Sequence, residues 1–187
     1  MTEIVTFRPF DACAAPADAL FARERLVLLQ LLPGADVQHV GGTAIPGCRT
    51  KGDLDIQVRV PRGAFEAAEA VLAAHYARNV GSDQTDTYAS FKDDDRDPPL
   101  GLQLTAIDGP YDDFWRFREV LLARPDLCAA YDRLKSAWHG REMDAYRAEK
   151  SRFFESLRAT PEFARLLGKR PPVAPGKALR RPAVKPS

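Results

Sequence analysis

The chain has 187 residues, of which 45% are apolar and 28% charged, and its formal net charge is +1. This length and apolar fraction are typical of one globular domain, or of a small domain with an appendage, and exclude a wholly disordered chain. Six basic and no acidic residues follow position 168, which leaves 21 basic against 26 acidic residues before it. We therefore expect no broad basic face for nucleic acid on the body.

The cysteines and the hydropathy pattern predict a cytoplasmic protein without a membrane anchor. Cys13, Cys48 and Cys128 are widely spaced and form no C-x-x-C pair, which argues against a disulfide framework or a zinc site. The chain does not open with a basic segment followed by an apolar run, so no signal peptide is expected. The longest apolar stretch, 26–32, is far too short to cross a bilayer.

Periodicity and turn residues predict strands mixed with helices up to about residue 110. A short strand or extended lead-in is expected over 4–10, and a helix from Asp11 or Pro16 to about Leu32. An alanine-rich helix is expected over 64–75, and an acidic loop over 93–99. The predicted strands cover 37–40, 53–60, 76–80, 87–91 and 100–107.

From residue 111 onward the pattern is helical, with helices expected over 112–123, 126–138, 142–157 and 161–167. The last segment, 169–187, is basic and proline-rich, and is interpreted as a flexible tail or a packed-on arm. The predicted divisions are 1–110 for a sheet domain, 111–168 for a helical bundle and 169–187 for the tail. Strands with helices first, then helices alone, indicate an α+β fold.

The segment 37–60 contains the pattern on which the functional hypothesis depends. Gly41-Gly42 follows the first strand, lets the backbone approach a ligand closely and offers N–H groups to a phosphate. Asp53 and Asp55 lie on one face of the next strand, roughly 6.6 Å apart along the backbone. Two carboxylates so placed can converge on a hard cation. The alternative is that both acids face solvent and the glycines only make a tight turn.

The chain contains one pattern that resembles the signature of the nucleotidyltransferase superfamily. This pattern is an apolar residue followed by Gly-Gly, then a gap of ten residues, then Asp-apolar-Asp-apolar. Within that superfamily, the chain resembles the GrpB (UPF0157) family over about residues 5–160. The segments that carry this resemblance are 39–47, 51–56, 117–125 and 131–135, with Tyr146, Lys150 and Phe153. The resemblance implies a nucleotidyltransferase-like mixed β-sheet flanked by helices.

The same resemblance implies a nucleotide site with assigned residues. Asp53 and Asp55 would be the catalytic metal ligands and hold Mg²⁺, with a two-metal site as one form. The phosphates of a nucleoside triphosphate would contact Gly41, Gly42, Thr43, Lys51 and Lys150. The reaction would transfer a nucleoside monophosphate to an unidentified hydroxyl acceptor.

A third carboxylate is expected from the strand 100–107, but Gln103 stands there, and a neutral amide is a poor Mg²⁺ ligand. Asp108 and the acidic loop are weaker candidates for that ligand. The alternative function is therefore a non-catalytic nucleotide- or protein-binding module on the same fold. Weak RNA contact through the basic tail is a further hypothesis. His39 is interpreted as a structural histidine, and Trp115 and Trp138 as core residues.

Overall fold

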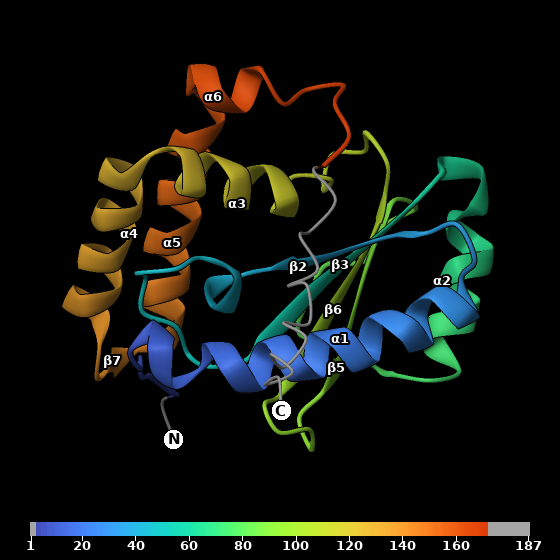
Figure 1. Ribbon diagram of the computed structural model, residues 1–187, viewed down its shortest axis with the longest axis horizontal. Coiled ribbons are helices and arrows are strands. Elements are labelled where there is room, and N and C mark those ends of the chain that lie inside the picture. The colour runs from blue at the N-terminus through green and yellow to red at the C-terminus, as the bar shows by residue number, and fades with distance from the viewer. Residues whose placement is uncertain (1–2, 172–187) are drawn as a thin grey trace, which may run out of the picture.

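A five-stranded mixed sheet forms the centre of the part of the chain that the structure, a computed structural model, describes, residues 3–171 (Figure 1). Its spatial order is β2-β3-β6-β5-β4, and neighbours are antiparallel except for the parallel pair β3–β6. The strands are β2 (Asp36–Val40), β3 (Leu54–Val60), β4 (Ala77–Arg78), β5 (Tyr88–Asp93) and β6 (Leu100–Ala106). Parallel neighbours need a long crossover, and the chain makes it through 61–99.

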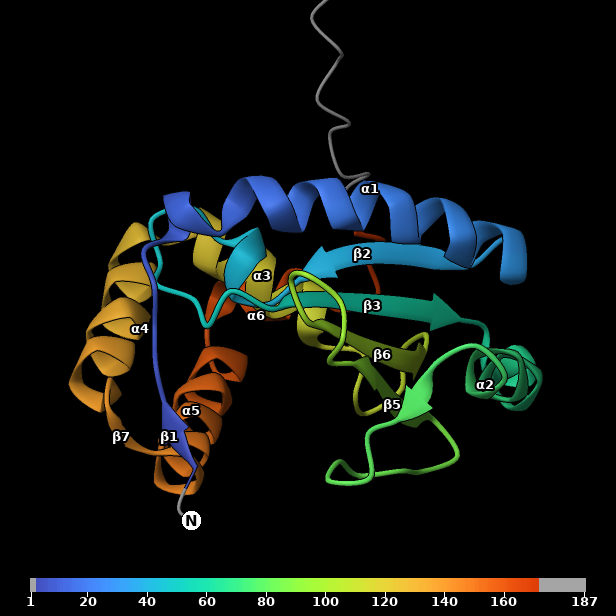
Figure 2. The same ribbon diagram turned by 90° about the horizontal axis from the view of Figure 1, so that it is seen from below.

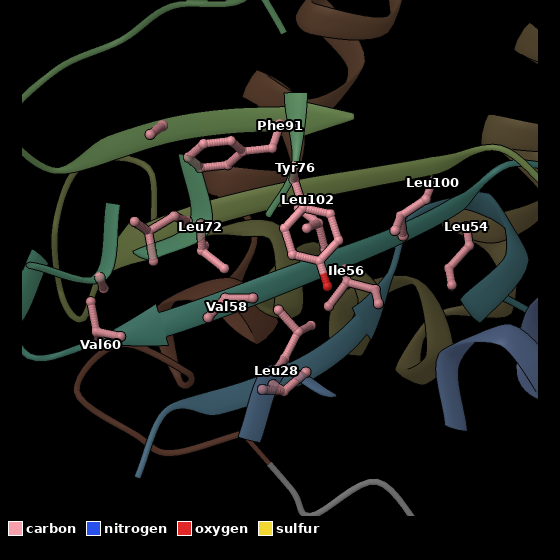
Figure 3. Packing of buried hydrophobic residues seen from close by; sticks show 14 of the residues in the cluster. Leu28, Leu54, Ile56, Val58, Val60, Leu72, Tyr76, Phe91, Leu100 and Leu102 are labelled. Carbon is pink, nitrogen blue, oxygen red and sulfur yellow. The ribbon is translucent and has the colours of Figure 1, made fainter. Parts of the chain in front are cut away.

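One face of the sheet is apolar and is covered by α1 (Ala14–Leu31) and α2 (Phe65–Ala73) (Figure 3). The alternate residues Leu54, Ile56 and Val58 of β3 point to this face and are fully buried. Leu28 of α1 and Leu72 of α2 pack in the same cluster. Each such side chain contributes about 1.5–3 kcal/mol to folding, so this layer holds the sheet and the two helices together.

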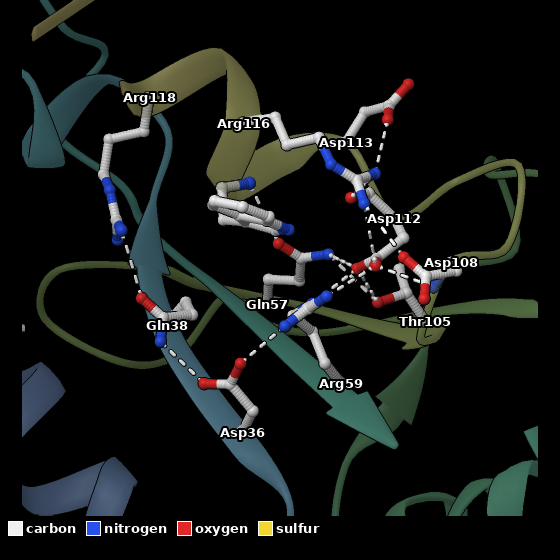
Figure 4. Close-up of polar contacts among 11 residues, drawn as sticks. Asp36, Gln38, Gln57, Arg59, Thr105, Asp108, Asp112, Asp113, Arg116 and Arg118 are labelled. Carbon is white, nitrogen blue, oxygen red and sulfur yellow. Dashed lines mark hydrogen bonds and ion pairs between the residues drawn. The ribbon is translucent and has the colours of Figure 1, made fainter. Parts of the chain in front are cut away.

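The opposite face of the sheet is polar but buried, and α3 (Phe114–Ala123) covers it (Figure 4). Arg59 of β3 donates from Nε and Nη2 to the two carboxylate oxygens of Asp112, each at 2.6 Å. Gln57 donates to Asp112 Oδ1 and accepts from the backbone N–H of Trp115. Buried charges are tolerated when they are paired in this way, so this network fixes the start of α3 on β3.

The C-terminal helices form a second layer beside the end of the sheet where β2 ends and β3 begins (Figure 2). They are α4 (Pro125–Trp138), α5 (Met143–Arg158) and α6 (Pro161–Ala164). Glu142 caps α5, because its carboxylate accepts from the N–H groups of Asp144 and Ala145. The short strands β1 (Ile4–Val5) and β7 (Arg141–Glu142) pair and tie the N-terminal segment to this layer.

The predicted α+β fold, a mixed sheet flanked by helices, is confirmed. The part after the sheet is mainly helical, as predicted, but it also contains the short strand β7, which was not predicted. The strand expected over 76–80 is shorter and forms only Ala77–Arg78, whereas the strand expected over 87–91 extends to Asp93. β3 begins at Leu54, so Asp53 lies just before the strand instead of on it. The alternation of polar and apolar faces along β3 is as predicted, but its polar face is covered, with Gln57 and Arg59 buried.

The division of the chain at residue 110 stays a prediction. Ile45 and Cys48 pack in the cluster of the C-terminal helices, and Phe7 packs against Tyr146. The predicted tail falls almost wholly on 172–187, outside the described residues. Within residues 3–171, no helix has the length and apolar character to cross a membrane.

Candidate functional site

A cavity of about 220 Å³ lies between the β2–β3 corner and the C-terminal helices. Eight of the residues that line it carry charge or lie at the predicted phosphate corner, and five sequence segments supply them. They are Gly41, Gly42, Lys51, Asp53, Asp55, Arg118, Lys135 and Lys150. The fold thus places the glycine corner, both acids and both of the predicted phosphate-binding lysines around one space.

Asp55 lies at the floor of this cavity, held closely by two glycines. A side chain at Gly41 would place its Cβ 2.1 Å from Asp55 Oδ2, and one at Gly101 would place it 3.0 Å from Asp55 Oδ1. Gly41 has φ +75° and ψ −166°, a conformation adopted almost only by glycine. The glycines on both neighbouring segments are therefore what allows the carboxylate to turn into the cavity.

Burial raises the pKa of the Asp55 carboxyl to about 6, and the charge of Asp53 adds to this. Lys150 and Lys51 oppose the shift, as does a hydrogen bond from Gln103. The two carboxylates therefore repel each other electrostatically beside the cavity. Asp55 is partly buried and lines the cavity, which speaks against the alternative that it simply faces solvent.

Asp53 forms an ion pair with Lys51, whose Nζ lies 2.7 Å from Asp53 Oδ2. The residue between them, Gly52, has φ +101°, and a Cβ there would lie 3.2 Å from Arg8 Nη1 and 3.3 Å from Cys13 Sγ. This left-handed turn lets residues 51 and 53 face the same side. Lys51 is half exposed, with 45% of its side chain accessible, so it is free to change partner.

Thr43, predicted to contact a phosphate, is buried and is not among the residues that line the cavity. Its hydroxyl donates to the carbonyl of Asp53 at 3.1 Å and lies 3.0 Å from Nε2 of His39. The hydroxyl therefore braces the β2–β3 corner and is turned away from a ligand. His39 is buried and stacks on Phe21, in agreement with the structural role expected for it.

The third carboxylate expected at the site is absent among the described residues. Gln103 does line the cavity and hydrogen-bonds to Asp55, while its Oε1 is buried without a partner. Asp108 pairs with Arg116 beyond the end of β6. Asp93 pairs with Arg96 in the β5–β6 hairpin. Neither of these acids lines the cavity, so the oxygen donors at its floor are two carboxylates and one amide.

The remaining walls come from aromatic side chains and two further cations. Tyr131 and Tyr146 line the cavity with Lys135, whose ammonium lies 4.0 Å from the ring centre of Tyr131. Lys135 is buried and donates to the backbone carbonyl of Arg49 and to Cys48 Sγ. Trp115 is fully buried, as predicted, whereas Phe114, Phe117 and Phe154 border the cavity.

Arg118 was not predicted as a site residue, and its role depends on the fold. Its guanidinium donates to the carbonyl of His39 at 2.6 Å and to Gln38 Oε1 at 3.1 Å. It therefore fixes the end of β2 immediately before the glycine corner while lining the cavity. Phe7 also reaches the cavity from the N-terminal segment, and no local sequence signal indicates this long-range placement.

A family model described as GrpB protein matches residues 16–160. The chain belongs to the GrpB family. A UPF0157 protein of Vibrio cholerae is 31% identical over 152 residues, which are 81% of this chain and 80% of that protein. The crystal structure of the conserved protein GrpB from Enterococcus faecalis covers 81% of this GrpB chain and 94% of its own, with a TM-score of 0.60 at 17% identity.

More distant structural likenesses lie outside the GrpB family. The Cid1 poly(U) polymerase aligns with a TM-score of 0.45 at 12% identity, over 65% of this chain and 41% of its own. A cytoplasmic RNA terminal U-transferase aligns with a TM-score of 0.46 at 16% identity, over 72% of this chain and 38% of its own. Likenesses at this level have no bearing on what this GrpB chain binds, and the function is argued from the cavity itself.

Proposed function

We propose that this cavity binds a nucleoside triphosphate together with one Mg²⁺, and that the protein transfers a nucleoside monophosphate to a hydroxyl acceptor. One observation carries the proposal: Asp53, Asp55 and the Gly41–Gly42 corner border the same small cavity. A carboxylate pair beside backbone N–H groups meets the needs of a metal-bound triphosphate, since the ion needs oxygen ligands and the phosphates need donors.

The oxygen donors fit one Mg²⁺. This ion is usually held by one or two carboxylates, with phosphate oxygens and waters completing an octahedron. Asp53 and Asp55 supply the carboxylates, and the amide N–H of Gln103 donates to Asp55 and so supports one of these ligands. The described residues contain no group of three or more His, Cys, Asp or Glu side chains arranged to hold a metal, and we therefore propose a single ion.

The cations of the cavity have separate tasks under this proposal. Lys51 lies just before β3 and Lys150 lies on α5, so two distant parts of the sequence supply them. Each ammonium group would offer a point charge to phosphate oxygens. Arg118 has its guanidinium engaged by β2 and positions the glycine corner. Bound Mg²⁺ would neutralise charge on the phosphates. Transfer would form a bond from the α-phosphorus to the acceptor oxygen and release pyrophosphate.

A second candidate function is nucleotide binding without transfer, and Gln103 favours it. An amide does not ionise and is a poor base, so the acceptor hydroxyl would lack a third carboxylate to take its proton. Pyrophosphate release separates the two candidates. Incubation with Mg²⁺, the four triphosphates and cell extract should release pyrophosphate above the Asp55→Asn background if transfer occurs, and none if the protein only binds.

Thermal melting with Mg²⁺ and each triphosphate in turn tests the binding itself. A ligand at about 100 times its dissociation constant stabilises the folded state by about 2.7 kcal/mol. We expect this stabilisation in the parent protein and its loss in Asp55→Asn. The matched control is Asp86→Asn, which removes an exposed carboxylate outside the cavity and should keep the shift. No shift with any triphosphate would reject the proposal.

A further inference from the structure

Basic side chains outnumber acidic ones around the cavity. Two carboxylates, Asp53 and Asp55, line it together with four basic side chains, Lys51, Arg118, Lys135 and Lys150. Lys51 contacts Asp53 directly, at 2.7 Å, and Lys51 and Lys150 both act electrostatically on Asp55. A divalent cation that enters alone would therefore find one ligand already paired and two ammonium groups beside it.

We infer that Lys51 is a gate which admits the metal to Asp53 only when a triphosphate enters with it, and this rests on the proposed function. Lys51 holds Asp53 Oδ2 until phosphate oxygens at the Gly41–Gly42 corner offer its ammonium a new partner. The polyanionic ligand also offsets the repulsion between the metal and the lysines. Metal and triphosphate thus bind with positive coupling, and each raises the affinity for the other by the same factor.

The backbone conformation at Gly52 keeps Lys51 beside Asp53. Lys51 and Asp53 are two residues apart, and the left-handed Gly52 between them faces Arg8 and Cys13, where a side chain would be crowded. The short link keeps the ammonium beside its carboxylate in the empty cavity. The exposure of the Lys51 side chain leaves room for it to swing away without disturbing the core.

Equilibrium dialysis tests the gate with Mn²⁺ as the metal probe and an equimolar mixture of the four non-hydrolysable nucleoside triphosphates. We expect the parent protein to retain Mn²⁺ about tenfold more tightly when the triphosphates are present. Lys51→Met should retain Mn²⁺ alone about tenfold more tightly than the parent protein, since Asp53 is then free and one positive charge is gone. Adding the triphosphates should then increase the Mn²⁺ retention of Lys51→Met only slightly.

Two further variants assign the effect to this ion pair. Arg49→Met removes a neighbouring positive charge that lies outside the cavity, and it should behave like the parent protein. Lys51→Met combined with Asp53→Asn should lose the gain in metal retention. Lys51 is exposed enough that its removal should leave the fold intact, which melting without ligands checks for every variant.

The outcomes separate the gate from the proposed function. If the parent protein retains Mn²⁺ alone as tightly as Lys51→Met, and still retains the triphosphates, the gate is wrong while the proposed function stands. If no protein retains any triphosphate, with or without Mn²⁺, both are wrong. If Arg49→Met gains metal affinity as much as Lys51→Met, the effect is general charge reduction and the gate is wrong.

Discussion

Gly41 lies so close to Asp55 that a single added Cβ at position 41 would come within 2.1 Å of Asp55 Oδ2. The contact joins the glycine corner after β2 to the carboxylate of β3, and their register places Val40 opposite Asp55. The glycine corner and the Asp55 carboxylate of the predicted nucleotide site are therefore in van der Waals contact, although they are fourteen residues apart in the sequence.

We predict that Gly41→Ala destabilises the protein by about 1–3 kcal/mol, through backbone strain and displacement of the Asp55 carboxylate. It should also abolish the melting shift given by Mg²⁺ and triphosphate. Urea unfolding and ligand-dependent melting measure the two effects.

The control for this change is Gly47→Ala, because Gly47 also has a left-handed φ, +79°, but has open space where a Cβ would go. It carries the backbone cost without the contact to Asp55. If Gly47→Ala removes the ligand shift as completely as Gly41→Ala, the close approach of Gly41 to Asp55 is not what matters.

The buried pair Arg59–Asp112 should be far more important for stability than an exposed pair of the same type. Arg59→Leu leaves the fully buried Asp112 carboxylate without its main partner and should cost about 3–5 kcal/mol. Arg62→Leu breaks the exposed pair with Asp86 and should cost less than about 1 kcal/mol. Equal losses of unfolding free energy for the two variants would contradict the role given to the network under α3.

His39 should make part of the stability depend on pH. Burial lowers its pKa from 6.5 to about 4, opposed by Asp18 and assisted by Arg118. Between these values the unfolded chain binds more protons than the folded one. Stability from this group is therefore full above about pH 6.5 and falls as pH is lowered towards 4, by up to about 3 kcal/mol.

His39→Gln keeps a side-chain donor near Thr43 but cannot titrate. Its stability relative to the parent protein should therefore improve as pH falls from about 7 to about 4.5. The raised pKa of Asp55 has the opposite effect, because its contribution to stability increases as pH falls. Comparing the variant with the parent protein at each pH cancels this contribution. A stability difference that stays constant over this range would show that His39 does not titrate as its burial predicts.

Gln103→Glu supplies the carboxylate that the site lacks. Without metal, the added charge beside Asp55 should lower the melting temperature, because like charges then repel in a partly buried site. With Mg²⁺, the variant should gain more stability than the parent protein gains. Gln103→Met, which adds no charge, serves as the control and should show no enlarged Mg²⁺ effect. If Mg²⁺ changes the melting temperature equally in the parent protein, Gln103→Glu and Gln103→Met, Gln103 does not lie beside the metal.

The sequence predicted the site best where the signal is local. The spacing between Gly41-Gly42 and Asp55 is a property of one hairpin, and the alternation along β3 follows from strand geometry alone. Both therefore appear in the structure as expected. Most helix ends were also predicted to within about two residues, because a proline such as Pro125, at which α4 begins, is a local signal. The exception is α6, which was predicted to reach residue 167 and ends at Ala164.

The features that the sequence did not predict depend on tertiary contacts. The sequence did not indicate that α3 covers the polar face of β3, because Asp112 can pair with Arg59 only after the chain has passed through α2, β4, β5 and β6. Thr43 looked like a phosphate ligand, but His39 and the Asp53 carbonyl engage its hydroxyl. Phe7 enters the cavity through the pairing of β1 with β7, which no periodicity reveals.

A crystal structure of the protein soaked with Mg²⁺ and a non-hydrolysable nucleoside triphosphate tests the central claim most directly. The account predicts phosphate density against the N–H groups of Gly41 and Gly42, one metal held by Asp53 and Asp55, and Lys51 turned from Asp53 to a phosphate oxygen. Triphosphate bound elsewhere, or an empty cavity with Lys51 still paired to Asp53 at saturating ligand, would contradict it.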